Sequence, residues 1–360
     1  MSDPKRAPMP LSFKPGYLDA LRRWEAYYAG EIIDRPLVNI TARKPGYAQV
    51  PGTNYRQRVF DDIDTLIDNM LAGAEATYYA GESIPSGWLS FGPDEIAYFC
   101  GAELGWNDKS GDTNWSKPFV DDWAEAFPLR LREDNPLWRR MLDFYRRAAV
   151  RTEGKMLLCP LDLHTNMDLL MAFRGSERLC LDLIDQPQVI DRAMADARAI
   201  FRQVWDATAK AGRMDERGYC HLAYSMEGAA VLQCDFCCMM GPAMFRRWVL
   251  PALEEEAEIV KHVVFHWDGK GALTHTDDLV ASRGLHTLAF QPGDGGGSHL
   301  DYIDLFQRIQ AGGKSVQVWG NIDQIKELHR HLRPEKTLYC TWANTPQEAD
   351  QLLEWFVKNT

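Results

Sequence analysis

The chain has 360 residues, of which 46% are hydrophobic and 25% are charged, the balance of an ordinary globular protein with a large core. Its formal net charge is −11 and it contains no block of Lys and Arg, which argues against a nucleic-acid-binding surface. The first residues lack the apolar core of a signal peptide, and no window approaches the roughly 18 apolar residues of a membrane span. We therefore expect a cytoplasmic protein with neither a membrane nor a nucleic acid as partner.

In chain order, short apolar runs alternate with longer amphipathic segments. The runs have strand length and close on Gly, Pro, Asn or Asp; they span 36–40, 88–91, 155–161, 219–225, 262–267, 286–291, 314–320 and 337–343. The amphipathic segments predict helices at 61–81, 187–212, 241–262, 301–312, 322–332 and 346–358. Repeated strand–helix alternation predicts an α/β protein, a single (β/α)8 TIM barrel over residues 1–360.

Two segments depart from this alternation. Residues 1–34 are expected to be an N-terminal extension whose helix covers one end of the barrel. Residues 101–154 are expected to be an insertion after the second strand, polar at first and then helical. No linker long enough to separate domains is found.

The eight cysteines lie in apolar contexts without the framework of a small disulfide-bonded domain, so most are expected to be buried thiols. CDFCC at 234–238 is the one stretch with zinc-like spacing. It has no second paired cluster, so packing is the favoured interpretation there.

In a barrel of this kind the active site lies at the carboxyl ends of the strands, where this chain has many polar side chains. His266 and Asp268 alternate on one strand and therefore point the same way. Together with Cys340 they form a plausible three-ligand shell for a divalent metal, most simply zinc, with one open position. The alternative is that the histidine is a hydrogen-bonded structural residue and the cysteine is core.

Other polar and aromatic residues near strand ends supply candidates for the remaining roles. Asp162, His164 and Glu227 are the candidates for proton transfer, against the alternative of satisfied polar pairs. Residues expected to line a site for a small-molecule substrate are Arg43, Trp267, Gln291, Trp319, Asn321 and Trp342, although core packing explains most of the tryptophans equally well. The glycine-rich loop at 291–297 suits either an anion cradle or a plain loop.

The order of these segments resembles the uroporphyrinogen decarboxylase superfamily, which includes zinc-dependent corrinoid and coenzyme M methyltransferases. The resemblance is carried by LCPLDLHTNMDLLMAFRGSERLCLDLIDQPQVI (158–190) and CDFCCMMGPAMFRRWVLPALEEEAEIVKHVVFHWDG (234–269). In the methyltransferase branch, a strand-end His-x-Cys pair and a later cysteine hold zinc. This implies His266, Asp268 and Cys340 as ligands, with Asp268 standing where the family has cysteine. That change replaces a soft sulfur ligand by a harder oxygen ligand, so a divalent metal other than zinc would also fit the site.

The resemblance implies a metal-dependent methyltransferase that activates a thiol acceptor or a methoxy substrate, with a corrinoid protein as partner. The first alternative is a metal-dependent hydrolase or lyase acting on a sugar-like or aromatic glycoside substrate. The second is a corrinoid- or ligand-binding barrel without turnover. The arginine-rich motif of the decarboxylase itself is not visible near Arg35 and Arg43, which argues against tetrapyrrole decarboxylation. The sequence leaves the oligomeric state open, with a homodimer among the options.

Overall fold

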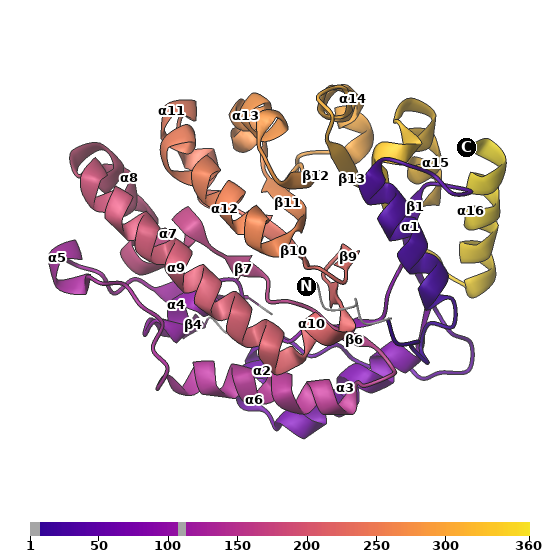
Figure 1. Ribbon diagram of the computed structural model, residues 1–360, viewed down its shortest axis with the longest axis horizontal. Coiled ribbons are helices and arrows are strands. Elements are labelled where there is room, and N and C mark those ends of the chain that lie inside the picture. The colour runs from indigo at the N-terminus through magenta and orange to yellow at the C-terminus, as the bar shows by residue number, and fades with distance from the viewer. Residues whose placement is uncertain (1–7, 107–112) are drawn as a thin grey trace, which may run out of the picture.

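A parallel β-sheet flanked by helices forms the centre of the molecule (Figure 1). The structure, a computed structural model, describes residues 8–106 and 113–360; short parts of the expected extension and insertion lie outside them. Eight strands pair in the order β2-β1-β14-β13-β12-β11-β10-β7, and the pair formed by β1 and β2 is antiparallel. These strands are β1 (Leu37–Arg43), β2 (Thr77–Gly81), β7 (Leu163–His164), β10 (Ala229–Gln233), β11 (His262–Asp268), β12 (Leu285–Gln291), β13 (Ser315–Trp319) and β14 (Thr337–Trp342).

The smaller strands pair separately from this sheet. β3 (Ser86–Gly87) pairs in parallel with β6 (Leu157–Leu158), while β4 (Glu103–Trp106) with β5 (Asn114–Lys117) and β8 (Tyr219–Cys220) with β9 (Tyr224–Ser225) form antiparallel pairs. Hydrogen bonds among the described residues therefore show a parallel α/β sheet, and they do not join it into a closed ring.

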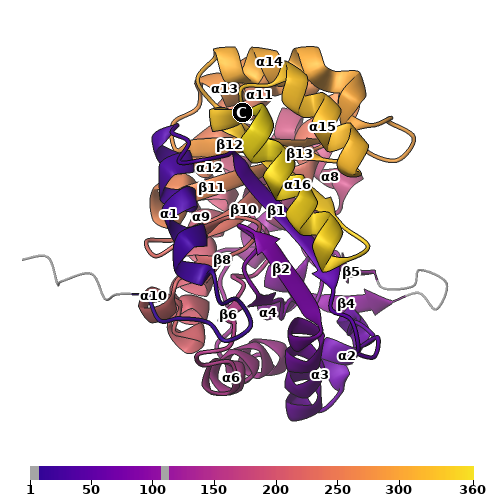
Figure 2. The same ribbon diagram turned by 90° about the vertical axis from the view of Figure 1, so that its right-hand side faces the viewer.

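Helices connect and cover the parallel strands, as crossover connections require. The longer ones are α1 (Tyr17–Ala29), α3 (Ile63–Glu75), α6 (Pro136–Arg151), α7 (Asn166–Arg174), α8 (Ser176–Asp185), α9 (Pro187–Gly212), α12 (Leu250–Val260), α14 (Ile303–Ala311), α15 (Ile322–His331) and α16 (Pro346–Asn359). Figure 2 shows α3 and α6 lying together at one end of the molecule, beyond the sheet. None of the helices in the described part of the chain combines the length and the apolar character needed to cross a bilayer.

Local sequence explains where these helices begin and bend. α9 starts with Pro187 in its first turn and ends at Gly212, and the residue that caps it, Arg213, has a φ of +55°. Its buried side chains recur every three or four residues, which is the period of a helix with one face on the core. The segment expected as one helix at 241–262 contains a π-helical turn, Phe245–Val249, directly before α12. Pro251 has no N–H for the regular ladder, which accounts for an irregular turn at this point.

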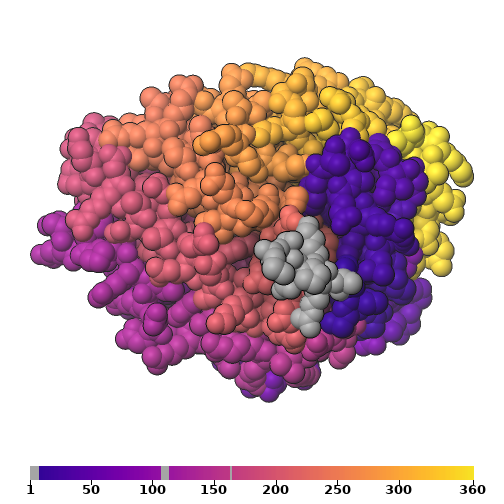
Figure 3. Space-filling view, in the orientation of Figure 1, coloured from indigo at the N-terminus to yellow at the C-terminus, as the bar shows by residue number. Residues whose placement is uncertain are grey.

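Helix α1 (Tyr17–Ala29) lies against the amino ends of the parallel strands. The hydroxyl of Tyr27 lies 2.8 Å from that of Thr287 on β12. The ring of Tyr28 stacks on His262, the first residue of β11, with ring centroids 3.8 Å apart. Figure 3 shows this indigo segment on the surface beside the yellow C-terminal segment. Helix α1 thus covers the amino ends of the parallel strands, opposite to their carboxyl ends.

A buried ion pair fastens the first strand of the sheet. Arg35 donates two hydrogen bonds of 2.7 Å to the carboxylate of Glu82, and both side chains are buried. The same carboxylate accepts the backbone N–H of Val38 at 2.9 Å. Because each charge has its partner in place, this pair fixes β1 against the turn that follows β2.

One strand prediction is wrong in a way that affects the site. The run at 219–225 does not form a long strand of the sheet, because Leu222 adopts a φ of +55° and turns the chain into the short hairpin of β8 and β9. The strand that joins the sheet at this point of the chain is β10, which begins after Gly228. Glu227 therefore precedes a sheet strand instead of following one.

Candidate metal centre

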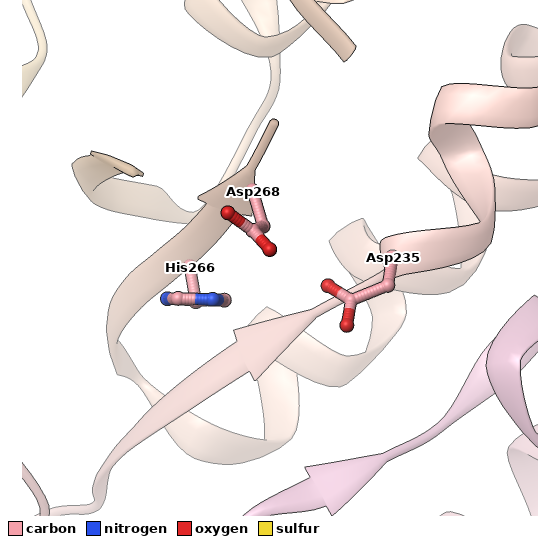
Figure 4. A group of neighbouring side chains, drawn as sticks. All are labelled: Asp235, His266 and Asp268. Atoms are coloured by element: carbon pink, nitrogen blue, oxygen red, sulfur yellow. The ribbon is translucent and has the colours of Figure 1, made fainter. Parts of the chain in front are cut away.

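Three side chains, two from β11 and one from the turn after the neighbouring strand β10, come together at the carboxyl edge of the sheet. One ligand atom from each of Asp235, His266 and Asp268 lies within 4.8 Å of the other two. Figure 4 shows the two carboxylates and the imidazole directed toward one another. His266 and Asp268 share a face of β11, as their spacing predicted, and Gly269 turns the chain away with a φ of +79°.

Asp235 reaches the cluster from the turn after β10. Gln233, the last residue of β10, is paired in register with His266, so the 3-10 turn Asp235–Met239 begins beside the end of β11. The Oδ1 atom of Asp235 is buried and has no hydrogen-bond partner among the described residues. Buried carboxylate oxygens are normally paired, so this oxygen is suited to accept a cation.

The donor set of one imidazole nitrogen and two carboxylates fits a divalent first-row metal ion. Zinc accepts both ligand types, and the oxygen-rich composition also suits manganese or iron. The cluster differs from the expected ligand set in its third member, which is Asp235 instead of Cys340.

Cys340 lies on β14, separated from β11 by β12 and β13. Its thiol is fully buried and accepts a hydrogen bond from Gln317 at 3.5 Å. Burial raises the pKa of this thiol, which keeps it protonated. The cysteine is two residues inside the end of its strand, whereas Trp342 stands at the edge.

Asp168 holds the turn that carries Asp235. It is fully buried on α7 (Asn166–Arg174), and its two oxygens accept the backbone N–H groups of Asp235 and Phe236 at 2.9 and 2.8 Å. Burial raises the pKa of Asp168 to about 6, against the lowering effect of His164. By holding this backbone, Asp168 orients the side chain of Asp235, as residues behind metal ligands commonly do.

His164, expected to take part in proton transfer, lies next to this group. Its Nδ1 is 3.9 Å from Asp168 and has no hydrogen-bond partner among the described residues. Burial lowers its pKa, but four carboxylates outweigh that effect and raise the pKa above its ordinary value; they belong to Asp168, Asp235, Asp94 and Asp162. The histidine is therefore suited to hold a proton near neutral pH.

Asp162 is placed beside the same group by Gln233, whose Nε2 donates to its Oδ1 at 2.9 Å. His221 is also buried near these residues, and its Nδ1 lacks a partner in the described part of the chain. Burial lowers the pKa of His221, Asp162 raises it, and His266 lowers it further. The structure thus brings Asp162 and His164 toward the cluster and adds His221.

Glu227 is at the other edge of the sheet. It is exposed, it precedes β10, and its charge acts on His262 at the amino end of β11. Because parallel strands put their carboxyl ends at one edge, a residue before β10 cannot share the edge occupied by Asp235. The structure therefore places Glu227 away from the cluster, at the opposite edge of the sheet.

A hollow of about 420 Å³ opens beside the cluster. Three of the residues expected at the substrate site line it, together with one member of the cluster; they are Gln291, Trp319, Trp342 and Asp268. A hollow of about 810 Å³ lies elsewhere, around residues 119–134, and none of the predicted site residues lines it. The smaller hollow is the better candidate because it touches the cluster.

The other expected substrate-binding residues have different surroundings. Trp267 is fully buried, with Nε1 donating to the carbonyl of Ala272 at 3.1 Å, so the structure gives it a core role. Asn321 caps α15, its side chain accepting the N–H of Gln324 at 3.0 Å. Arg43 is exposed at the end of β1 and donates to the carbonyl of Tyr47 at 2.6 Å.

Comparison with solved structures shows a protein of the same fold. The chain is similar to a methyltransferase from Methanosarcina mazei, with a TM-score of 0.61 at 13% sequence identity. The similarity covers 97% of this chain and 99% of the other. No protein-family model matches the chain, and no curated protein matches it by sequence. This chain therefore has the α/β fold of the methanogen protein over nearly its whole length.

Proposed function

We propose that this protein is a metal-dependent methyltransferase-like enzyme of the uroporphyrinogen decarboxylase superfamily, with its site at the mouth of a (β/α)8 barrel. The observation that carries the proposal is the cluster of Asp235, His266 and Asp268 beside the hollow at the carboxyl edge. The quoted sequence resemblance supports it, and so does the fold shared with a protein named as a methyltransferase.

The chemistry follows from the groups at this edge. A divalent ion held by the three side chains would lower the pKa of a bound thiol or polarise a methoxy oxygen. His164, with its pKa raised by surrounding carboxylates, holds a proton that it can give to a leaving group or return to the solvent. Asp162 lies close enough to influence that proton. A corrinoid protein that carries the methyl group is the partner this chemistry implies.

The first experiment is elemental analysis of the purified protein and three variants. We expect about one equivalent of zinc or another divalent ion, by analogy with three-ligand sites. The ion should be lost in Asp235→Ala and His266→Ala and kept in Cys340→Ala, which serves as the matched control. Retention in Asp235→Ala with loss in Cys340→Ala would contradict this ligand set and restore the one expected from sequence. No ion in any sample after reconstitution would refute metal dependence.

The second candidate is a metal-dependent hydrolase or lyase, which the oxygen-rich donor set favours. Product analysis separates the two reactions. Methyl transfer yields a methylated acceptor, whereas hydrolysis or elimination yields two fragments without methyl transfer. A ligand-binding barrel without turnover would show saturable binding and no product.

A further inference from the structure

The hollow beside the cluster has no positively charged side chain among the residues that line it. Among the described residues that line it, Asp268 is the only charged one. His299 also lines it, but this histidine is buried, and burial lowers its pKa to about 4. Its Nδ1 accepts the backbone N–H of Trp319 at 2.9 Å, which requires that nitrogen to be unprotonated. A carboxylate or phosphate ligand would therefore meet no counter-charge here.

Several polar groups around the hollow are already used within the protein. The Ser298 N–H and hydroxyl donate to Asp301 at 2.7 and 3.2 Å. The side-chain oxygen of Gln324 accepts the N–H of Asn321 at 2.9 Å.

In the glycine-rich loop, the N–H of Gly296 donates to the Gly293 carbonyl at 3.0 Å. The N–H of Gly269 donates to the Gln291 carbonyl at 2.9 Å. These two amides near the hollow are therefore not available to an anion.

Two indoles remain as the main recognition surface. Trp319 is half-buried at the end of β13, and Trp342 is 57% exposed at the end of β14; both line the hollow with Asp268. We propose that this hollow binds a methylated ammonium group, held by cation–π contact with Trp319 and Trp342 and by the carboxylate of Asp268. The group meant is a quaternary ammonium, which carries a positive charge and has no N–H that needs a partner, and this matches the lining.

The inference rests on the proposed function, because it names a methyl donor for the same site, in place of a methyl group carried by a corrinoid protein. In the transfer, a carbon–nitrogen bond of the ammonium breaks and its electron pair stays on nitrogen, giving a neutral tertiary amine. The sulfur of a thiolate acceptor forms the new carbon–sulfur bond, and the proton of the original thiol passes to solvent. A divalent ion held by the cluster would be balanced by the carboxylates of Asp235 and Asp268, so the cluster with its ion would carry no net positive charge to repel this donor.

The test compares choline with its neutral carbon isostere, dimethylbutanol, by isothermal titration calorimetry on the full chain. The two molecules have nearly the same shape and differ in charge. We expect choline to bind about tenfold more tightly or better, the scale of a desolvated cation–π contact. Equal affinity for the two molecules, or tighter binding of acetate or glucose than of choline, would overturn the proposal.

Variants locate the binding to the indoles. Trp342→Ala and Trp319→Leu should each weaken choline binding about tenfold. Trp115→Ala is the matched control, because Trp115 is 40% exposed on β5 and does not line the hollow. Unchanged choline affinity in both Trp319 and Trp342 variants would refute the assignment. Metal content is measured on the same samples. A protein that lacks metal but prefers choline refutes the proposed function and supports choline binding in the hollow. A protein that holds metal but shows no preference for choline supports the proposed function and refutes this inference.

Discussion

Replacing Asp168 by asparagine should weaken metal binding through the turn that positions Asp235. The carboxylate accepts two backbone N–H groups, those of Asp235 and Phe236. Asparagine keeps one acceptor oxygen and places an NH2 group opposite the other N–H. One charge-assisted hydrogen bond is then lost at a fully buried position, a cost of about 2 kcal/mol.

This cost falls on the turn that positions Asp235. If the turn shifts, the loss appears in metal affinity, where about 2 kcal/mol corresponds to roughly a 30-fold weaker binding constant. That value agrees with the loss of metal affinity, on the order of 10- to 100-fold, that follows when a group that orients a metal ligand is removed. The assay is competition with a chromophoric chelator, together with a thermal unfolding curve for each protein.

The control is Asp182→Asn. Asp182, on α8, is buried and accepts hydrogen bonds from Trp123 and from Arg174 at the end of α7. Its variant should lose stability while each folded molecule keeps its metal affinity. A metal affinity of Asp168→Asn within about threefold of the wild type would refute the positioning role, since less than 1 kcal/mol would then reach the site.

Three further outcomes are expected. Burial raises the pKa of Glu256 from 4.5 to about 8, so the folded state keeps a proton that the unfolded state loses. Its contribution to the free energy of unfolding is complete below about pH 4.5 and is lost as the pH rises to about 8, by up to about 1.4 kcal/mol per pH unit. Urea unfolding at several pH values should show a flatter pH dependence of this free energy in Glu256→Gln. The same pH dependence in the variant as in the wild type would contradict this. Arg35→Met should lower the free energy of unfolding by about 3–5 kcal/mol, because it removes the bidentate partner of the buried Glu82 carboxylate and leaves Arg23, whose Nη1 lies 3.8 Å from Oε1. A loss below about 1 kcal/mol would show that Arg23 or water replaces Arg35 at this carboxylate. Trp267→Ala should cost about 3–5 kcal/mol of stability while its folded fraction binds choline normally; weaker choline binding by that fraction would argue against a core role.

The sequence was sufficient for the parts of the fold that local patterns determine. β11 and β12 agree with their predicted ranges to within one residue, because each is a run of apolar residues closed by Gly or Pro. The spacing of His266 and Asp268 likewise determined that they share a face. The hairpin at Leu222 was missed, because an apolar run with one residue at positive φ looks like a continuous strand.

The third member of the cluster depended on tertiary structure. Asp235 belongs to a 3-10 turn without periodicity, and its position follows from the pairing of Gln233 with His266. The one available signal was the CDFCC stretch at 234–238. Its cysteine spacing resembles that of a zinc site, but the candidate ligand it supplies is Asp235. Cys340 looked equivalent along the chain, but three strand spacings, roughly 14 Å along the sheet, separate β14 from β11.

The contact of α1 with the amino ends of the strands also constrains the order in which the protein can be completed during synthesis. Tyr27 and its partner Thr287 are 260 residues apart in the chain. A ribosome that adds roughly 5–20 residues per second needs roughly 13–50 s to cover that distance. During this interval the aromatic face of α1 has no finished sheet to pack on. A nascent chain would therefore expose Tyr27 and Tyr28 until β12 emerges, and chaperones that recognise aromatic segments would find this helix early and release it late.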